Sequence, residues 1–418
     1  MMKTVDQPEH IQSILRRLAS AGREAYLVGG CVRDSVMGRA VHDWDVATSA
    51  VPDEIIALFE KTVPTGMKYG TVTVVIPGGA VEVTAFRTES GYTDGRHPGT
   101  VTFASSLEED LSRRDFTMNA IAVSRANEMI DPYGGLEDIE KKVVRCVGEP
   151  DTRFAEDALR MFRAFRFSAE LDFAIAPETL TSIVRNADKA AMISAERVRT
   201  EVEKTLLSHR PEVAGEIVSA GLLDSYLTKG RERPASLQRL AAIKALPAEP
   251  APRWCAFCAI LADKGLIEDA GTFLRGLRLD ANTVRTCKAA LTIIGMQNSF
   301  NMSTAAATAA ATDAAPSRVA IKRLLAKHGA DAVRCAAAAR DALRGGSALT
   351  DADEIINSGE CFSLDALAIT GSDLLSLGRP RGREIGETLA LLLDYVIQRP
   401  DRNNRATLLK YIEETGKK

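Results

Sequence analysis

The spacing of apolar residues changes along the chain, and the change divides the sequence in two. Over 7–22 the apolar residues recur every three or four positions, which predicts a helix. Short apolar or alternating runs then predict strands at 25–28, 44–47, 71–76, 81–86 and 120–124, with helices near 52–60 and 107–113. Together these segments predict a mixed α/β layer in the first third of the chain.

Helical spacing dominates after Gly148. Helices are predicted at 151–170, 177–187, 194–208, 212–220, 235–244, 251–263, 265–276, 280–294, 316–328, 331–343 and 383–396. We therefore predict four domains, which are an α/β head (1–147), a helical neck (148–210), a helical body (211–345) and a helical tail (346–418). The low-complexity stretch 303–315 is either an alanine-rich helix or a connector.

The stretch 27–48 carries the first candidate chemistry. An apolar strand runs into Gly29-Gly30 and a short helix, and glycines at such a turn let the backbone approach an anionic ligand closely. Downstream, Asp43 and Asp45 are two positions apart, so on a strand both carboxylates point to one face. Two carboxylates that face a glycine turn suit a site for Mg²⁺ and a nucleoside triphosphate.

The order GGxVRDxxxG followed by DxD resembles the signature of the enzymes that add CCA to tRNA 3′ ends and of the related bacterial poly(A) polymerases. The chain is similar to the class II tRNA nucleotidyltransferases, strongly over 24–210 and weakly beyond. The resemblance implies a polymerase-beta-like palm as the head, Mg²⁺ as cofactor, and tRNA, CTP and ATP as partners. It also implies that pyrophosphate is released by a two-metal reaction. Asp43 and Asp45 would hold the metal, while Gly30 and Arg33 would contact the triphosphate.

The predicted strand 81–86 carries Glu82 between two valines. Its carboxylate is either an exposed side chain or a third acid that assists the metal or accepts a proton from the attacking hydroxyl. The polar segment 88–100 follows and contains Asp94 and Arg96. It resembles the flexible loop of class II enzymes, which acts as a lever between the CTP and ATP states. The resemblance favours complete CCA addition over addition of CC alone.

Two adjacent arginines, Arg113 and Arg114, precede the predicted strand at 120–124. Two guanidiniums at a helix end suit a phosphate clamp, and we assign Arg114 to the triphosphate. Asp115 and Asn119 would orient that clamp or the ribose hydroxyls. The alternative is a surface ion pair of little energetic consequence. The string RRDFTxNA resembles a motif that is specific to the same family.

The run from Glu156 to Arg166 predicts a continuous helix on which Asp157 and Arg160 are neighbours, three positions apart. They form either an ordinary intrahelical ion pair or a pair that reads a base. Cytosine and adenine present an amine donor beside a ring-nitrogen acceptor, whereas guanine and uracil present the reverse, so a carboxylate beside a guanidinium matches C and A. The residues resemble the EDxxR motif by which the family selects nucleotides. Arg163 and Arg166 continue a basic stripe towards the triphosphate.

A second charged segment in the predicted neck resembles another motif of the family. Ser194 is a candidate helix N-cap, and Arg197 and Glu201 lie on the turns that follow. We favour a structural brace beneath the selecting helix over a direct contact with the nucleotide.

Composition limits these assignments. The formal net charge is −3, so any RNA surface must be a local basic patch, and 5% aromatic residues argue against stacking platforms for single strands. Seven cysteines are scattered, and the one close pair, Cys255 and Cys258, is more typical of a buried core than of a metal or redox site. The odd count of thiols fits the cytoplasm. No run approaches the roughly 20 apolar residues of a membrane span, and the first ten residues lack a signal core.

Other functions stay open at this point. A poly(A) polymerase or an enzyme that adds only CC would use the same palm, and a non-catalytic RNA-binding protein would lack the carboxylates of Asp43 and Asp45. The dipeptide His42-Asp43 stands without the further ligands that an HD phosphohydrolase needs. The stretch 367–409 resembles the tail that grips the tRNA elbow and acceptor stem. The sequence does not indicate the oligomeric state.

Overall fold

The computed structural model describes residues 4–90, 100–103, 106–235, 237–304, 317–344, 347–378 and 380–415. Contacts divide the chain into two compact units. Unit 1 comprises Met1–Thr205, Val213–Ser225 and Arg233–Ser236, and unit 2 comprises Leu206–Glu212, Tyr226–Glu232 and Leu237–Lys418. Every described residue of the predicted site lies in unit 1. The division into head, neck, body and tail stays a prediction.

A mixed sheet forms the core of the first part of unit 1. Within the described residues it has seven strands in the order β3-β4-β5-β2-β1-β8-β9. The strands are β1 (Ala25–Val28), β2 (Asp45–Thr48), β3 (Thr62–Gly66), β4 (Thr71–Ile76), β5 (Gly79–Ala85), β8 (Ala122–Ser124) and β9 (Met129–Ile130). Strands β2 and β5 are parallel, and the other neighbours are antiparallel. The edge strands β3 and β9 were not expected from the sequence.

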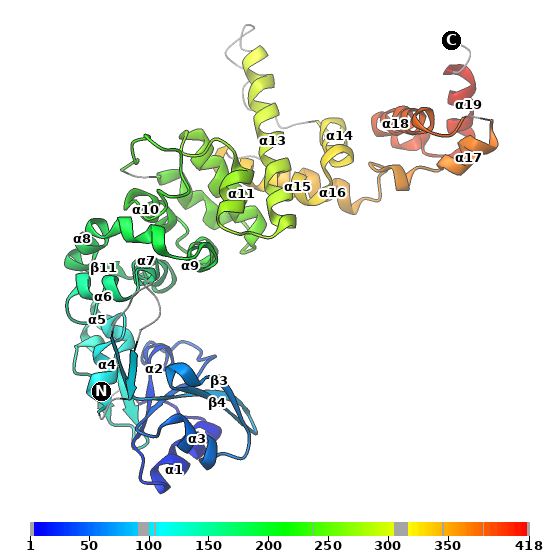
Figure 1. The fold of residues 1–418 in the computed structure, drawn as a ribbon. Helices are drawn as coiled ribbons and strands as arrows, with labels where there is room; N and C mark the ends of the chain where they lie inside the picture. The colour runs from blue at the N-terminus through cyan, green and yellow to red at the C-terminus, as the bar shows by residue number, and fades with distance from the viewer. Residues whose placement is uncertain are drawn as a thin grey trace. The chain divides into compact units, whose positions relative to one another are not determined.

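Helices and a small ribbon complete this part of unit 1. Helix α1 (Glu9–Ser20) buries an apolar face and packs with α3 (Pro52–Leu58) against strands of the sheet (Figure 1). The short helix α2 (Gly30–Val36) follows β1 directly, and α4 (Leu107–Ser112) is followed by the 3₁₀ turn Thr117–Asn119. Strands β6 (Arg87–Ser90) and β7 (Thr100–Phe103) pair antiparallel. The predicted loop residues Asp94 and Arg96 lie outside the described residues.

The rest of unit 1 is largely helical. Its main elements are α5 (Gly135–Lys141), α6 (Pro150–Glu156), α7 (Leu159–Leu171), α8 (Pro177–Arg185), α9 (Ala195–Leu207) and α10 (Val213–Ser219). The continuous helix predicted over 151–170 is wrong, because the chain is extended at Asp157, with φ −143° and ψ 103°. The Asp157 carboxylate accepts a hydrogen bond of 3.0 Å from the Leu159 N–H and so caps the start of a new helix.

Unit 2 is helical throughout its described residues. It contains a 3₁₀ segment (Gln238–Ala245), α11 (Pro250–Asp263), α12 (Ala270–Gly276), α13 (Ala281–Thr304), α14 (Arg318–His328), α15 (Ala330–Arg344), α16 (Ala348–Asn357), α17 (Gly371–Ser376), α18 (Arg383–Gln398) and α19 (Arg405–Thr415). Helices α11, α13 and α15 pack together, and the thiols of Cys255 and Cys258 are buried there as free cysteines. Most of the alanine-rich stretch lies outside the described residues.

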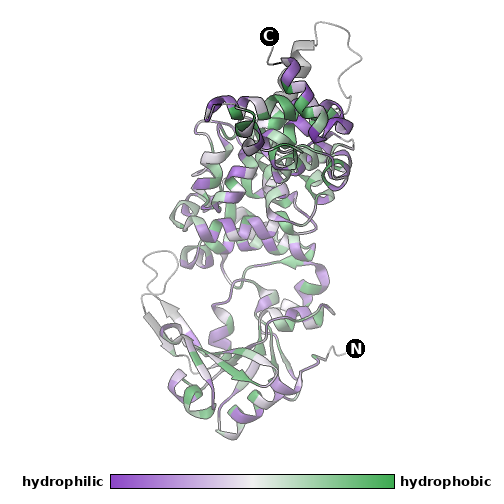
Figure 2. Ribbon diagram, turned by 90° about the vertical axis from the view of Figure 1, so that its right-hand side faces the viewer, coloured by the Kyte–Doolittle hydropathy of each residue, from purple (hydrophilic) through white to green (hydrophobic). Residues whose placement is uncertain are grey.

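Hydrophobic and hydrophilic residues alternate along individual helices in Figure 2. This is the amphipathic pattern of helices that bury one face against a core. Among the described residues, no helix combines the length and the apolar character that crossing a membrane requires.

Candidate active site

One cavity of about 750 Å³ in unit 1 collects the charged residues that the sequence analysis singled out. Its lining includes Gly29, Gly30, Arg33, Asp43, Asp45, Glu82, Arg113, Arg114, Asp115, Asn119, Asp157, Arg160, Arg163, Arg166 and Arg197. The β1–α2 turn, the sheet, and the helices α7 and α9 each contribute to it. Residues more than 110 positions apart in sequence, such as Asp45 and Asp157, therefore line the same space.

The sheet supplies the acidic residues. Asp45 on β2 is in register with Glu82 on the parallel strand β5, so both side chains leave the same face of the sheet. Asp43 was expected on the strand with Asp45, but β2 begins only at Asp45, and Asp43 lies in the irregular segment before it. Burial raises the pKa of Asp45 to about 6, and the neighbouring carboxylates of Glu82 and Asp43 add to the shift against the opposing charge of Arg114.

These carboxylates fit a metal site only if a substrate completes it. Among the described residues, no group of three or more His, Cys, Asp or Glu side chains is arranged to hold a metal ion. Mg²⁺, however, is usually bound by one or two carboxylates together with water and substrate phosphates. Asp43 and Asp45 match that open arrangement. Burial is the main cause of the raised pKa of Asp45, and the charges of Glu82 and Asp43 add to it, so a bound cation would be favourable at this position.

Arg114 lies next to the glycine turn. Its Nη2 donates to Asp110 at 3.1 Å, while its Nε is buried without a hydrogen-bond partner. Gly29 has φ +81°, and a Cβ at that position would lie 3.0 Å from Arg114 Nη1 and 3.8 Å from Asp45 Oδ2. The missing side chain thus keeps open a space between a guanidinium and a carboxylate. Because the guanidinium of Arg114 borders this open space, the space suits an anionic ligand.

A chain of hydrogen bonds joins the turn to α7. Arg33 Nη1 donates to Asn119 Oδ1 at 2.8 Å, and Asn119 Nδ2 donates to Asp115 at 3.1 Å. Arg163 Nε and Nη2 both donate to Asp115, at 2.8 and 2.5 Å. Although burial alone would raise it, the pKa of Asp115 is lowered, chiefly by the charge of Arg163. Arg33 also forms a fork with the Asp34 carboxylate, so much of its donor capacity is already used.

Asp157 and Arg160 are not paired with each other. Arg160 Nη1 donates to Glu156 at 2.6 Å, and its Nη2 donates to the Arg113 carbonyl at 2.8 Å. Asp157 instead accepts from Arg197 Nη2 at 2.7 Å. The helix is interrupted at Asp157, so Asp157 precedes the helix that carries Arg160, and its carbonyl accepts from the Arg160 N–H at 3.0 Å. Both side chains nevertheless line the cavity.

Comparison with known proteins shows the family to which this chain belongs. The family model for the poly A polymerase head domain matches residues 25–145, and the model for the probable RNA and SrmB-binding site of polymerase A matches 172–226. The CCA-adding enzyme of Geobacillus kaustophilus is 37% identical over 415 residues, which cover 98% of this chain and 97% of the relative. This chain belongs to the family of CCA-adding enzymes.

Other CCA-adding enzymes show the same likeness. The one from Geobacillus thermodenitrificans is 47% identical over 267 residues, which span 64% of this chain and 65% of that relative. The crystal structure of the Bacillus stearothermophilus CCA-adding enzyme in complex with CTP aligns with a TM-score of 0.77 and 34% identity, covering 97% of this chain and 98% of that one. The identity is therefore higher in a shorter aligned segment than over the whole length.

The structure of this CCA-adding enzyme family member adds residues that the sequence reasoning missed. Three guanidinium carbons, those of Arg33, Arg163 and Arg166, lie 5.1, 5.3 and 4.0 Å from the ring centre of Phe167. Phe167 is therefore a common support for three arginines of the cavity. The sequence signal that could have identified Phe167 is its position as an aromatic residue directly after Arg166. Arg166 is in turn held by Glu201 at 2.6 Å and Glu170 at 2.7 Å.

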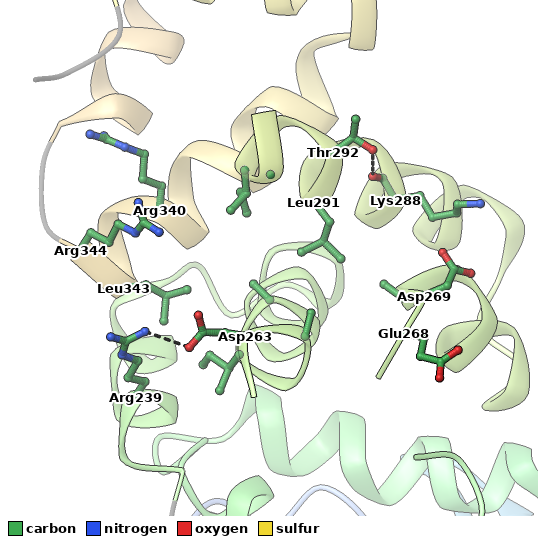
Figure 3. Close-up of a pocket in the computed structure, with 16 residues that line it drawn as sticks. Arg239, Asp263, Glu268, Asp269, Lys288, Leu291, Thr292, Arg340, Leu343 and Arg344 are labelled. Carbon is green, nitrogen blue, oxygen red and sulfur yellow. Dashed lines mark hydrogen bonds and ion pairs between the residues drawn. The ribbon is translucent and has the colours of Figure 1, made fainter. Parts of the chain in front are cut away.

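A second cavity, of about 460 Å³, lies in unit 2 (Figure 3). Arg239 forms an ion pair with Asp263 at its edge, with 3.3 Å between Nη1 and Oδ2. Glu268 and Asp269 lie apart from Arg340 in the view of Figure 3. Its charges are thus spread around an apolar wall that includes Leu291 and Leu343, whereas the cavity in unit 1 concentrates carboxylates beside a glycine turn. The cavity in unit 1 is the candidate active site.

Proposed function

We propose that this chain is a tRNA nucleotidyltransferase that adds C, C and A to tRNA 3′ ends without a nucleic-acid template. One observation carries the proposal: paired carboxylates, a partly unsatisfied arginine and the Asp157–Arg160 wall line the same cavity. Membership of the CCA-adding enzyme family supports it. Solved structures of other members are described as complexes with CTP, with ATP and with tRNA, which are the partners we propose here.

We assign the metal to Asp43 and Asp45, because they are the carboxylates that the cavity presents beside the glycine turn. The cofactor proposed is Mg²⁺, which when bound supplies positive charge that acidifies the attacking hydroxyl and neutralises the triphosphate. Glu82, in register with Asp45, is placed to assist as a third acid or to accept the hydroxyl proton.

The reaction transfers a nucleotidyl group. The 3′ oxygen of tRNA attacks the α-phosphorus of CTP twice and of ATP once. Each time a bond forms between that oxygen and the α-phosphorus, the bond from the α-phosphorus to the bridging oxygen breaks, and pyrophosphate leaves. The side chains that orient the triphosphate are Arg33 and Arg114, beside the backbone of Gly30.

Hydrogen bonds with Asp157 and Arg160 select the base of the incoming nucleotide. Asp157 accepts from the exocyclic amine, and Arg160 donates to the ring nitrogen, so G and U leave charged groups unpaired. Such mismatches give discrimination of about 10⁴ in buried sites. Arg163 and Arg166 lie along the same wall and contribute their remaining N–H groups towards the triphosphate. Affinity for tRNA comes from backbone contacts, and we expect it to fall steeply with salt.

One assay tests the proposal. The purified chain is incubated with tRNA that ends at the discriminator base, Mg²⁺ and each labelled nucleotide. We expect two C residues from CTP alone and one further A when ATP is added. Growth with ATP alone would instead identify a poly(A) polymerase, which the matched family model keeps as the second candidate. Arrest after two C residues would identify a CC-adding enzyme, and no extension would leave an RNA-binding protein.

A tRNA substrate and free thiols point to the cytoplasm as the compartment.

A further inference from the structure

Helix α9 carries two charged residues that pair with residues lining the candidate active site. Arg197 and Glu201 are four positions apart and so lie on one face of the helix. Arg197 donates to Asp157 at 2.7 Å, and Glu201 accepts from Arg166 Nε at 2.6 Å. One helix therefore contacts a residue at the break between α6 and α7 and a second residue further along α7.

The two residues of the reading pair are held in different ways. Arg160 lies on regular helix and is anchored by Glu156 and by the carbonyls of Arg153 and Arg113. Asp157 lies on extended backbone between α6 and α7. Its carboxylate is fixed by two bonds: Oδ1 accepts from the Leu159 N–H at 3.0 Å, and Oδ2 accepts from Arg197.

Two bonds to two oxygens set the plane of a carboxylate, and one bond does not, since the group can then rotate about it. The ion pair is also sheltered, because the side chains of Arg197 and Asp157 are 21% and 20% exposed. It is thus better restrained than an ordinary surface pair. We propose that Arg197 is a positioning residue for nucleotide selection: it fixes the direction in which Asp157 accepts, without contacting the reacting atoms.

This inference rests on the proposed function and deepens it. Loss of Arg197 leaves the carboxylates at Asp43 and Asp45 and the clamp at Arg114 intact, so nucleotidyl transfer itself should continue. The ratio of kcat/KM between correct and incorrect nucleotides should change, because a carboxylate that can rotate offers no acceptor in a fixed direction. A purely structural brace predicts the opposite pattern, in which all nucleotides lose rate in the same proportion.

The test compares kcat/KM for CTP and UTP on tRNA that lacks CCA. We expect Arg197→Ala to lower the CTP preference at least about tenfold, mainly through a higher KM for CTP. Arg197→Met keeps the apolar stem without donors and gives the same result if the Ala variant folds poorly. Arg197→Lys, a single-point donor, should recover part of the preference. The matched control is Arg199→Ala on the same helix, which is not part of the cavity lining and should keep the wild-type ratio.

An unchanged CTP to UTP ratio in the Ala and Met variants, with both rates lowered alike, would overturn the inference. A ratio that falls equally in Arg199→Ala would overturn it as well, since the effect would then belong to the helix and not to the contact. If the wild-type chain itself does not extend tRNA with CTP, the proposed function fails first, and that result is separate from any effect of Arg197.

Discussion

The two walls of the candidate active site differ in how their charged side chains are paired. On the carboxylate wall (Asp43, Asp45 and Glu82), acids gather together, and burial raises the pKa of Asp45 to about 6. On the paired wall, which faces the cavity from α6, α7 and α9, each charged group has a partner of opposite sign. Its ion pairs are Arg160–Glu156, Asp157–Arg197, Arg163–Asp115 and Arg166–Glu201.

The difference indicates a division of work. Like charges held close together are unfavourable until a cation arrives, so the carboxylate wall is suited to binding one. Opposite charges that are already paired attract a ligand less strongly than unpaired ones, but they hold their remaining hydrogen-bonding atoms in fixed directions. We infer that the carboxylate wall serves the chemistry and that the paired wall serves selection. Changes on the two walls should therefore differ in kind.

The largest effect is expected on the carboxylate wall. Replacing Asp45 by Ala should lower the rate of nucleotide addition by about 10³-fold or more, because the several kcal/mol that a bound metal contributes would be lost. Binding of tRNA should change less than about twofold. Single-turnover rates and a filter-binding assay measure the two quantities. Asp53→Ala, an exposed acid on α3, is the control. A variant of Asp45 that retained wild-type rate would refute the assignment.

The next effect should appear on the paired wall and alter selection. Exchanging both Asp157 and Arg160 for Ala should preserve addition but admit UTP or GTP, with a loss of discrimination of about 10²-fold or more. Competition between labelled nucleotides on one tRNA measures it. Arg185→Ala, which removes an exposed ion pair on α8, should not alter the ratio. If the double variant stays strict for C and A, the paired wall does not read the base.

The walls also differ in how far the sequence predicted them. The glycine turn and Asp45 were identifiable because they lie within one short stretch, in which spacing determines geometry. The segment 151–170 was predicted as one helix because its apolar residues keep a helical period across Asp157. That period does not reveal that the Asp157 carboxylate caps a new helix by accepting from the Leu159 N–H. The partner of Asp157 is Arg197, 40 positions away, and such tertiary pairing is not encoded in local pattern.

The neighbouring pairs support the same conclusion. Arg163 was expected to extend a basic stripe, yet its guanidinium is engaged by Asp115, 48 positions earlier. Residue types and motif order thus identified which residues line the cavity. Which N–H groups of each arginine stay free for a ligand depends instead on contacts between distant segments, which the sequence pattern does not show. The roles of individual residues in nucleotide binding stay predictions for the experiments above.

The smallest effect concerns stability and follows from the raised pKa of Asp45. The pKa of the Asp45 carboxyl is about 6 in the folded chain and 3.8 ordinarily. Between pH 3.8 and pH 6 the folded chain therefore binds more protons at this group than the unfolded chain does. Stability of the metal-free protein should therefore fall as the pH rises from about 4 to 6 and then level off. Asp45→Asn removes the charge and should abolish this component. The effect is bounded by about 3 kcal/mol, since each tenfold change in proton affinity is worth about 1.4 kcal/mol.

Thermal melts with EDTA, recorded from pH 4 to pH 7.5, measure the difference. The Asn variant should melt a few degrees above the wild type at pH 7.5 and close to it at pH 4. Adding Mg²⁺ at pH 7.5 should raise the wild-type Tm and leave the variant nearly unchanged, because only the wild type keeps both acids at the site. Parallel melting profiles for the two proteins, with and without the ion, would mean that the carboxylate wall carries no uncompensated charge. The contrast between the two walls would then have no electrostatic basis.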